Sequence, residues 1–223
     1  LSNYPAGRAV YNNNVVALRA ALRSGASPNC TFSTGENGIM PLLAVAAREG
    51  REECLRVLIE AGADLNGRAT ALCQAARKGH LACARHLLDA GSDVNARIRG
   101  GRPIITIACE RGDHAIVQLF VDRGANISLE YKGCTPLFTA LRHGRRQTVL
   151  TLLRAGAPCR ALTSTQIKPE HVALNDWMIQ IMNAGGWAAR VERHRRPLMS
   201  ILSRLALPHD ALRVILSFWS PPG

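Results

Sequence analysis

The residue types that most often carry enzyme chemistry occur in this sequence without the spacings that catalysis requires. The chain has 223 residues, among them seven histidines and seven cysteines. It contains no G-x-G-x-x-G, P-loop or H-E-x-x-H string, so neither a phosphate-binding glycine loop nor a zinc-protease helix is indicated. No spacing identifies a cysteine and a histidine as nucleophile and base. We therefore expect a non-enzymatic protein without cofactor or metal.

The cysteines are spread along the chain. They are Cys30, Cys54, Cys73, Cys83, Cys109, Cys134 and Cys159. An odd number without a C-x-x-C pair argues against a disulfide scaffold and against a zinc site. Reduced, mostly buried thiols are expected instead, in an intracellular protein of the cytoplasm or nucleus.

No segment of the sequence predicts export or a membrane span. A basic-then-apolar signal segment is not visible near the N-terminus. The longest uncharged stretch near the C-terminus, residues 177–189, is shorter than the roughly 20 apolar residues that a spanning helix needs. We therefore expect no transmembrane segment.

Positive charge is concentrated in the second half of the chain. Lysine and arginine number 28 against 16 acidic residues, a net charge of +12. Residues 96–160 hold eleven basic and four acidic residues, whereas residues 1–95 hold ten and eight. Such a field favours an acidic partner, which a protein segment, a nucleic acid or an anionic lipid surface could supply.

The elements that position these charges follow from three recurring sequence blocks. One begins with the glycines Gly25, Gly62, Gly91, Gly124 and Gly156. A second, apolar block opened by Pro or Thr precedes the last four of them, at Pro41–Ala46, Thr70–Ala76, Pro103–Ala108 and Thr135–Ala140. A third, between the other two, begins with Gly50, Gly79, Gly112 and Gly144. Self-similarity at a fixed period is the signature of a repeat protein.

Each repeat predicts two short helices. Pro or Thr suits a helix start, and the middle glycine provides the turn to the second helix. Apolar residues then recur at spacings of three and four, as in residues 54–59 and 117–121. The glycine of the first block ends the second helix, with a positive φ expected.

These blocks, in this order and at a period near 33, resemble the ankyrin repeat over residues 5–160. The resemblance implies an all-α ankyrin-repeat solenoid of about five to six helix-pair repeats with a C-terminal helical tail. Units are expected near 5–29, 37–66, 67–95, 98–128 and 131–160, with a degenerate unit at 162–186. The ankyrin domain would thus be residues 1–186 and the tail 187–223, with a longer finger at residues 30–38. His80 stands where the family carries Gly-His, which implies a hydrogen bond to the backbone.

Ankyrin arrays bind partners on the concave face made of finger tips and first helices. The partner-binding residues that the resemblance implies are Tyr11, Arg48, Arg77, Arg99, Arg102, Arg111, Tyr131, Lys132, Phe138 and Arg142. Arginine and aromatic residues are frequent hot spots, which makes Tyr131 and Phe138 candidate anchors. Phe138 equally fits a core position. The predicted function is a protein–protein interaction module whose basic face binds an acidic segment.

The tail predicts a second pair of helices. Leu198, Ile201, Leu202 and Leu205 share one helical face, and Pro208 ends that helix. A Pro-Leu start looks like a divergent SOCS box, although Leu202 stands where that box usually has Cys. The residues that would bind the adaptor are Pro197, Leu198, Ile201, Leu202, Leu205, Leu207 and Pro208.

Three interpretations of the tail remain open. A SOCS box would bind elongin B–C and a cullin, making the chain a substrate receptor of a cullin-RING ubiquitin ligase. Leu207 and Pro208, followed by further apolar residues, also look like an F-box start. An apolar cap that seals the last repeat is the third interpretation.

The alternative function is binding of nucleic acid or anionic lipid by the basic region and by the run at residues 190–196. Aromatic residues make up only 4% of the chain, which leaves few side chains for base stacking. No nucleic-acid-binding motif is present either.

Overall fold

The computed structural model describes residues 5–33, 38–66, 71–98 and 100–158. All of them belong to one compact unit, residues Leu1–His171. The predicted degenerate repeat and the tail lie outside the described residues.

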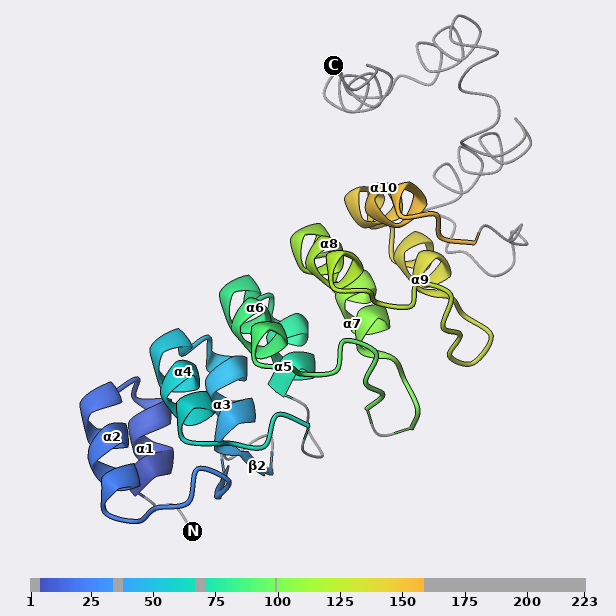
Figure 1. Cartoon of the computed structure of the whole chain (residues 1–223). Helices are drawn as coiled ribbons and strands as arrows, with labels where there is room; N and C mark the ends of the chain where they lie inside the picture. The colour runs from blue at the N-terminus through green and yellow to red at the C-terminus, as the bar shows by residue number, and fades with distance from the viewer. Residues whose placement is uncertain (1–4, 34–37, 67–70, 99, 159–223) are drawn as a thin grey trace, which may run out of the picture. The chain divides into compact units, whose positions relative to one another are not determined.

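Within the described part, ten helices follow one another as five pairs (Figure 1). The pairs are α1 (Pro5–Tyr11) with α2 (Val15–Arg23), α3 (Leu42–Glu49) with α4 (Glu52–Glu60), α5 (Ala71–Lys78) with α6 (Leu81–Asp89), α7 (Ile104–Arg111) with α8 (His114–Asp122), and α9 (Pro136–Arg142) with α10 (Arg146–Arg154). The first helices α1, α3, α5, α7 and α9 contact one another in that order, and so do the second helices. The predicted all-α solenoid of helix pairs is confirmed.

The first helices are buried almost all round. Leu42 to Ala47 of α3 and Ile104 to Cys109 of α7 are all buried, because each helix packs against two neighbouring first helices and its own second helix. The second helices bury one stripe instead. In α4 this stripe is Cys54, Leu55, Val57 and Leu58, as the apolar spacing predicts.

The helix ends also follow the sequence. Thr135 caps α9, with its hydroxyl accepting a hydrogen bond from the Phe138 N–H at 3.1 Å. Pro41 and Pro103 occupy the same position before α3 and α7. The glycines expected to end the second helices all have positive φ, from 77° at Gly62 to 97° at Gly91.

The finger after the first pair is a β-hairpin. Strands β1 (Thr31–Ser33) and β2 (Ile39–Pro41) pair antiparallel, with Phe32 opposite Met40. The repeat resemblance predicts a longer finger here but not its two strands, so the all-α array carries a small antiparallel sheet.

Candidate functional site

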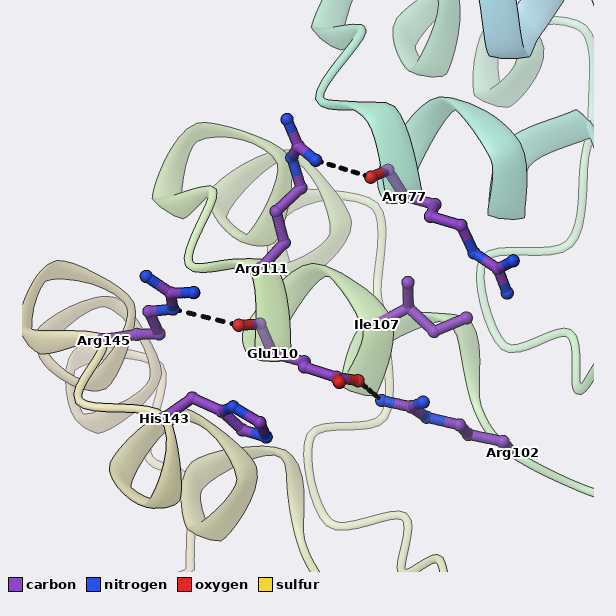
Figure 2. A pocket seen from close by; sticks show the side chains of 7 residues that line it. All are labelled: Arg77, Arg102, Ile107, Glu110, Arg111, His143 and Arg145. Atoms are coloured by element: carbon purple, nitrogen blue, oxygen red, sulfur yellow. Dashed lines mark hydrogen bonds and ion pairs between the residues drawn. The ribbon is translucent and has the colours of Figure 1, made fainter. Parts of the chain in front are cut away.

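A polar cleft of about 640 Å³ lies along the last turns of α5 and α7 and the turn after α9. We call it the arginine cleft; it is lined by Arg77, Arg102, Ile107, Glu110, Arg111, His143 and Arg145 (Figure 2). Four of these side chains are guanidinium groups and one is a carboxylate. The cleft therefore has a mainly positive lining, with the buried Ile107 as its one apolar residue.

A second cleft of about 270 Å³ adjoins the first and shares Arg102, Glu110 and His143 with it. We call it the aromatic cleft; its other lining residues are Thr106, Tyr131, Lys132, Cys134, Phe138, Thr139 and Arg142. Together the two clefts present cations, a carboxylate and two aromatic rings on one continuous surface.

Arg102 is held at the junction of the clefts by α7. Its Nε donates to the Thr106 hydroxyl at 3.1 Å, and an Nη donates to the Thr106 carbonyl at 3.4 Å. Thr106 is itself buried and donates its hydroxyl hydrogen to the Pro103 carbonyl at 2.7 Å. The same Nη of Arg102 pairs with the Glu110 carboxylate (Figure 2). These contacts fix the guanidinium before any ligand arrives.

The Glu110 carboxyl is kept ionised by this arrangement. The hydrogen bond from Arg102 lowers its pKa, and the charges of Arg102, His143 and Arg77 act in the same direction, against a partial burial that raises it. The side chain is still 43% exposed, so the carboxylate faces the cleft.

Arg111 and Arg145 also connect neighbouring repeats. Arg111 donates to the Arg77 carbonyl at 2.8 Å, and Arg145 donates to the Glu110 carbonyl at 3.0 Å (Figure 2). Both carbonyls lie in the last turn of a helix, where a cation is favourable.

In earlier repeats, too, a side chain reaches a backbone carbonyl of the preceding repeat. The His80 ring nitrogen lies 3.0 Å from the Arg48 carbonyl, which confirms the expected backbone bond. Arg51 donates to the Tyr11 carbonyl at 3.3 Å. The bridging side chains thus stabilise the stack as well as lining a surface.

The structure brings seven of the ten predicted partner-binding residues to these two clefts. They are Arg77, Arg102, Arg111, Tyr131, Lys132, Phe138 and Arg142. Phe138 is half-buried, between the two alternatives expected for it. Arg142 and Lys132 are exposed.

The other predicted residues lie elsewhere or are not described. Tyr11 lies at the end of α1, with its ring 6.4 Å from that of Phe32. The Arg48 side chain is only 14% exposed and pairs with Glu49 at 3.6 Å, so it presents little of its charge to a ligand. Arg99 and all the tail residues predicted to bind an adaptor lie outside the described residues.

Sequence reasoning missed Thr106 and Ile107 as parts of the site. Both stand inside an apolar helix block, where burial against neighbouring helices is the ordinary expectation. The available signal was position, because residues 106 and 110 fall four apart on α7 and so share a face with the side chain of Arg102.

Metal-binding clusters, poised thiols and membrane-spanning helices would be other functional features of the described residues. None of their His, Cys, Asp and Glu side chains gather in a group that could hold a metal ion. Burial raises the pKa of the Cys83 thiol to about 11 and that of Cys109 further still, so neither is a poised nucleophile. None of the helices in this part of the chain is long and apolar enough to cross a membrane.

Comparison with known families identifies the repeats. The family model described as "Ankyrin repeats (3 copies)" matches residues 7–98 and again residues 97–162. No curated protein matches the chain. Ankyrin repeats are in general non-enzymatic modules of protein–protein interaction. With most of its length matched in this way, the chain belongs to the ankyrin-repeat family.

Proposed function

We propose that the arginine cleft and the aromatic cleft bind an acidic segment of a partner protein. The observation that carries this proposal is the charge of their lining. The cations are Arg77, Arg102, Arg111, Lys132, Arg142 and Arg145, and Glu110 is the one carboxylate among the residues that line the two clefts. A hollow lined by one sign of charge concentrates ligands of the opposite sign.

Four of the six cations form two groups. Arg111 and Arg145 each donate one hydrogen bond to a backbone carbonyl, which orients the guanidinium. A guanidinium has five N–H donors, so most of the donor set remains for ligand carboxylates. Arg142 and Lys132 are exposed and would make the first contacts with an approaching acidic chain.

The aromatic cleft adds an apolar subsite beside the charges. Phe138 and Tyr131 line it, and the Lys132 ammonium lies 5.4 Å from the centre of the Tyr131 ring. An apolar side chain of the ligand would pack here while neighbouring carboxylates meet the cations. The preferred ligand is therefore an acidic segment with an apolar residue within it, not a uniformly charged polymer.

Titration of the full chain with a labelled peptide tests the proposal. The probe is a fluorescein-labelled oligoglutamate peptide with one central leucine, followed by fluorescence anisotropy. We expect the double variant K132E/R142E to bind at least about tenfold more weakly, because two contacts become repulsions. The control R56E/R85E makes the same charge change on α4 and α6 and should bind within about twofold of wild type. Equal losses in both variants would refute cleft-specific binding.

The same titration distinguishes the nucleic-acid alternative. A labelled single-stranded oligonucleotide replaces the peptide, and salt is varied. Tighter binding of the oligonucleotide, with an affinity that falls steeply as salt rises, would favour phosphate recognition through counterion release. We expect the peptide to be preferred, since its leucine has a subsite and nucleobases find few aromatic partners.

For the tail we propose an adaptor-binding role that rests on its sequence pattern alone. Co-expression of the full chain with elongin B–C, followed by size exclusion, tests this role. We expect a stable complex that is lost in the variant L198E/L202E, because both leucines belong to the predicted apolar face. Absence of a complex with the wild-type chain would rule out the SOCS-box interpretation.

A further inference from the structure

Glu110 departs from the pattern of the other repeats. Arg48, Arg77 and Arg142 each stand two residues before the turn glycine that follows their helix, and Glu110 stands at that position in α7. The last turn of a helix favours a cation and disfavours a carboxylate. The backbone carbonyl of Glu110 serves the stack as the acceptor for Arg145, whereas its side chain lines the clefts.

The Glu110 carboxylate lies where a ligand carboxylate would be strongest bound. It lines both clefts, pairs with Arg102, and is within electrostatic reach of Arg77 and His143. Arg102 is the guanidinium at the junction of the clefts and the one oriented by Thr106. Glu110 therefore occupies, from inside the molecule, the central anion position of the site.

We propose that Glu110 is an internal competitor that lowers the affinity of the clefts for acidic segments. A ligand carboxylate approaching Arg102 must share or displace Glu110, and it is repelled by that charge in either case. Weak acidic stretches are thereby rejected, and only a segment with several acids and a well-placed apolar residue binds. This inference rests on the proposed function, and it sets a minimum number of acidic residues that a segment needs in order to bind.

Replacing Glu110 with glutamine removes the charge, keeps the size of the side chain and leaves one acceptor oxygen for Arg102. We expect E110Q to bind the oligoglutamate peptide about 3- to 10-fold more tightly, the range expected when one like charge a few ångströms away is removed from a half-exposed site. The control E53Q raises the net charge by the same amount on α4, where the glutamate pairs with Arg56. It should change the affinity less than twofold.

Fluorescence anisotropy on the full chain decides between the outcomes, with thermal unfolding recorded for each variant. Tighter binding by E110Q but not by E53Q supports the competitor. If K132E/R142E abolishes binding while E110Q binds equally or more weakly than wild type, the competitor is refuted and the acidic-segment site stands; weaker binding would make Glu110 a positioning residue for Arg102. If neither wild type nor E110Q binds the peptide, both proposals fail. If E110Q and E53Q tighten binding equally, net charge is the cause and the competitor is again refuted.

Discussion

At the scale of single residues, several glycines are explained by the side chain that lies against them. A Cβ at Gly112 would come within 2.4 Å of Arg145 Cδ, and a Cβ at Gly50 would come within 2.7 Å of the His80 ring. These are the glycines over which the bridging side chains pass to reach the preceding helix. The turn glycine of one repeat therefore makes room for the bridge from the next.

Gly112→Ala should destabilise the array more than a glycine replacement without a neighbour. An alanine there is strained by the positive φ of 87°, and its Cβ also collides with the Arg145 side chain. The matched control is Gly124→Ala, which has a φ of 79° but nothing within 4 Å of its added Cβ. Urea unfolding should give a loss that is roughly 1 kcal/mol larger for Gly112→Ala. Equal losses of unfolding free energy in the two variants would mean that only the backbone conformation matters, and that the contact with Arg145 does not.

The stability contributed by the Arg102–Glu110 pair should depend on acid pH. Because the folded-state pKa of Glu110 is lowered below its ordinary 4.5, its contribution is present above that pH and is lost as the pH falls through the folded value. The difference in unfolding free energy between wild type and E110Q should therefore shrink below about pH 4.5. A difference that stays constant from pH 7 to pH 3 would contradict the pairing.

Native thiols should react in an order set by burial. Cys30 and Cys134 are half-buried, whereas Cys54, Cys73, Cys83 and Cys109 are buried. Desolvation raises the thiol pKa values of these four buried cysteines and also that of Cys30. Limited alkylation with iodoacetamide near neutral pH, resolved by peptide mass spectrometry, should modify Cys30 and Cys134 before the other four cysteines of the described residues. Early modification of Cys109 in the folded protein would contradict the packing of α7.

At the scale of elements, a ladder of side chains joins the loops that follow the second helices. In each step an asparagine oxygen accepts the backbone N–H of a residue in the next repeat. The steps are Asn29 with Asp64 (2.7 Å), Asn66 with Asp93 (3.5 Å) and Asn95 with Asn126 (2.7 Å). At the following step the corresponding residues are Ser128 and Pro158. Proline has no N–H, so the ladder ends before the α9–α10 pair.

Restoring that step should stabilise α9 and α10. The variant S128N/P158D supplies both an acceptor and an N–H, and one net hydrogen bond contributes about 0.5–1.5 kcal/mol. S128N alone should gain nothing because its partner is missing, and P158D alone reports the cost of losing proline. A double-mutant cycle from urea unfolding should show favourable coupling between the two changes. Additive effects would show that the ladder does not hold these loops.

Most of the helices could be predicted from sequence, and the reasons are local. Thr135 as a cap, the stripe at Cys54 to Leu58 and the glycine turns each specify their element through nearby residues. The hairpin at β1 and β2 could not, because it depends on a distant contact. Phe32 packs on α1, where a Cβ at Gly7 would come within 2.1 Å of its ring.

The candidate site was predictable in its charge and not in its construction. The excess of arginine after residue 96 indicates a basic face. The stacking of adjacent repeats decides which arginines donate to a backbone carbonyl, as Arg111 and Arg145 do, and which are left to face a ligand. The contacts of Arg102 with both Thr106 and Glu110 likewise depend on the three-dimensional arrangement of α7 and the residues before it.

At the scale of the whole molecule, the stack places residues from three repeats on one surface. Arg77 belongs to α5, Glu110 to α7 and Arg142 to α9, and they meet because these helices pack in sequence. No single repeat contains the site. A partner would therefore recognise the assembled array, and unfolding of the last described pair would remove Phe138, Thr139 and Arg142 from the aromatic cleft.

Binding of an acidic segment in the two clefts can be tested by hydrogen–deuterium exchange of the full chain, with and without a saturating concentration of the oligoglutamate peptide. We expect slower exchange in the segments 100–112 and 130–145, which carry all the cleft residues except Arg77, and no change in α4 and α6. Protection confined to the second helices, or the same protection in K132E/R142E as in wild type, would contradict binding of an acidic segment in these clefts.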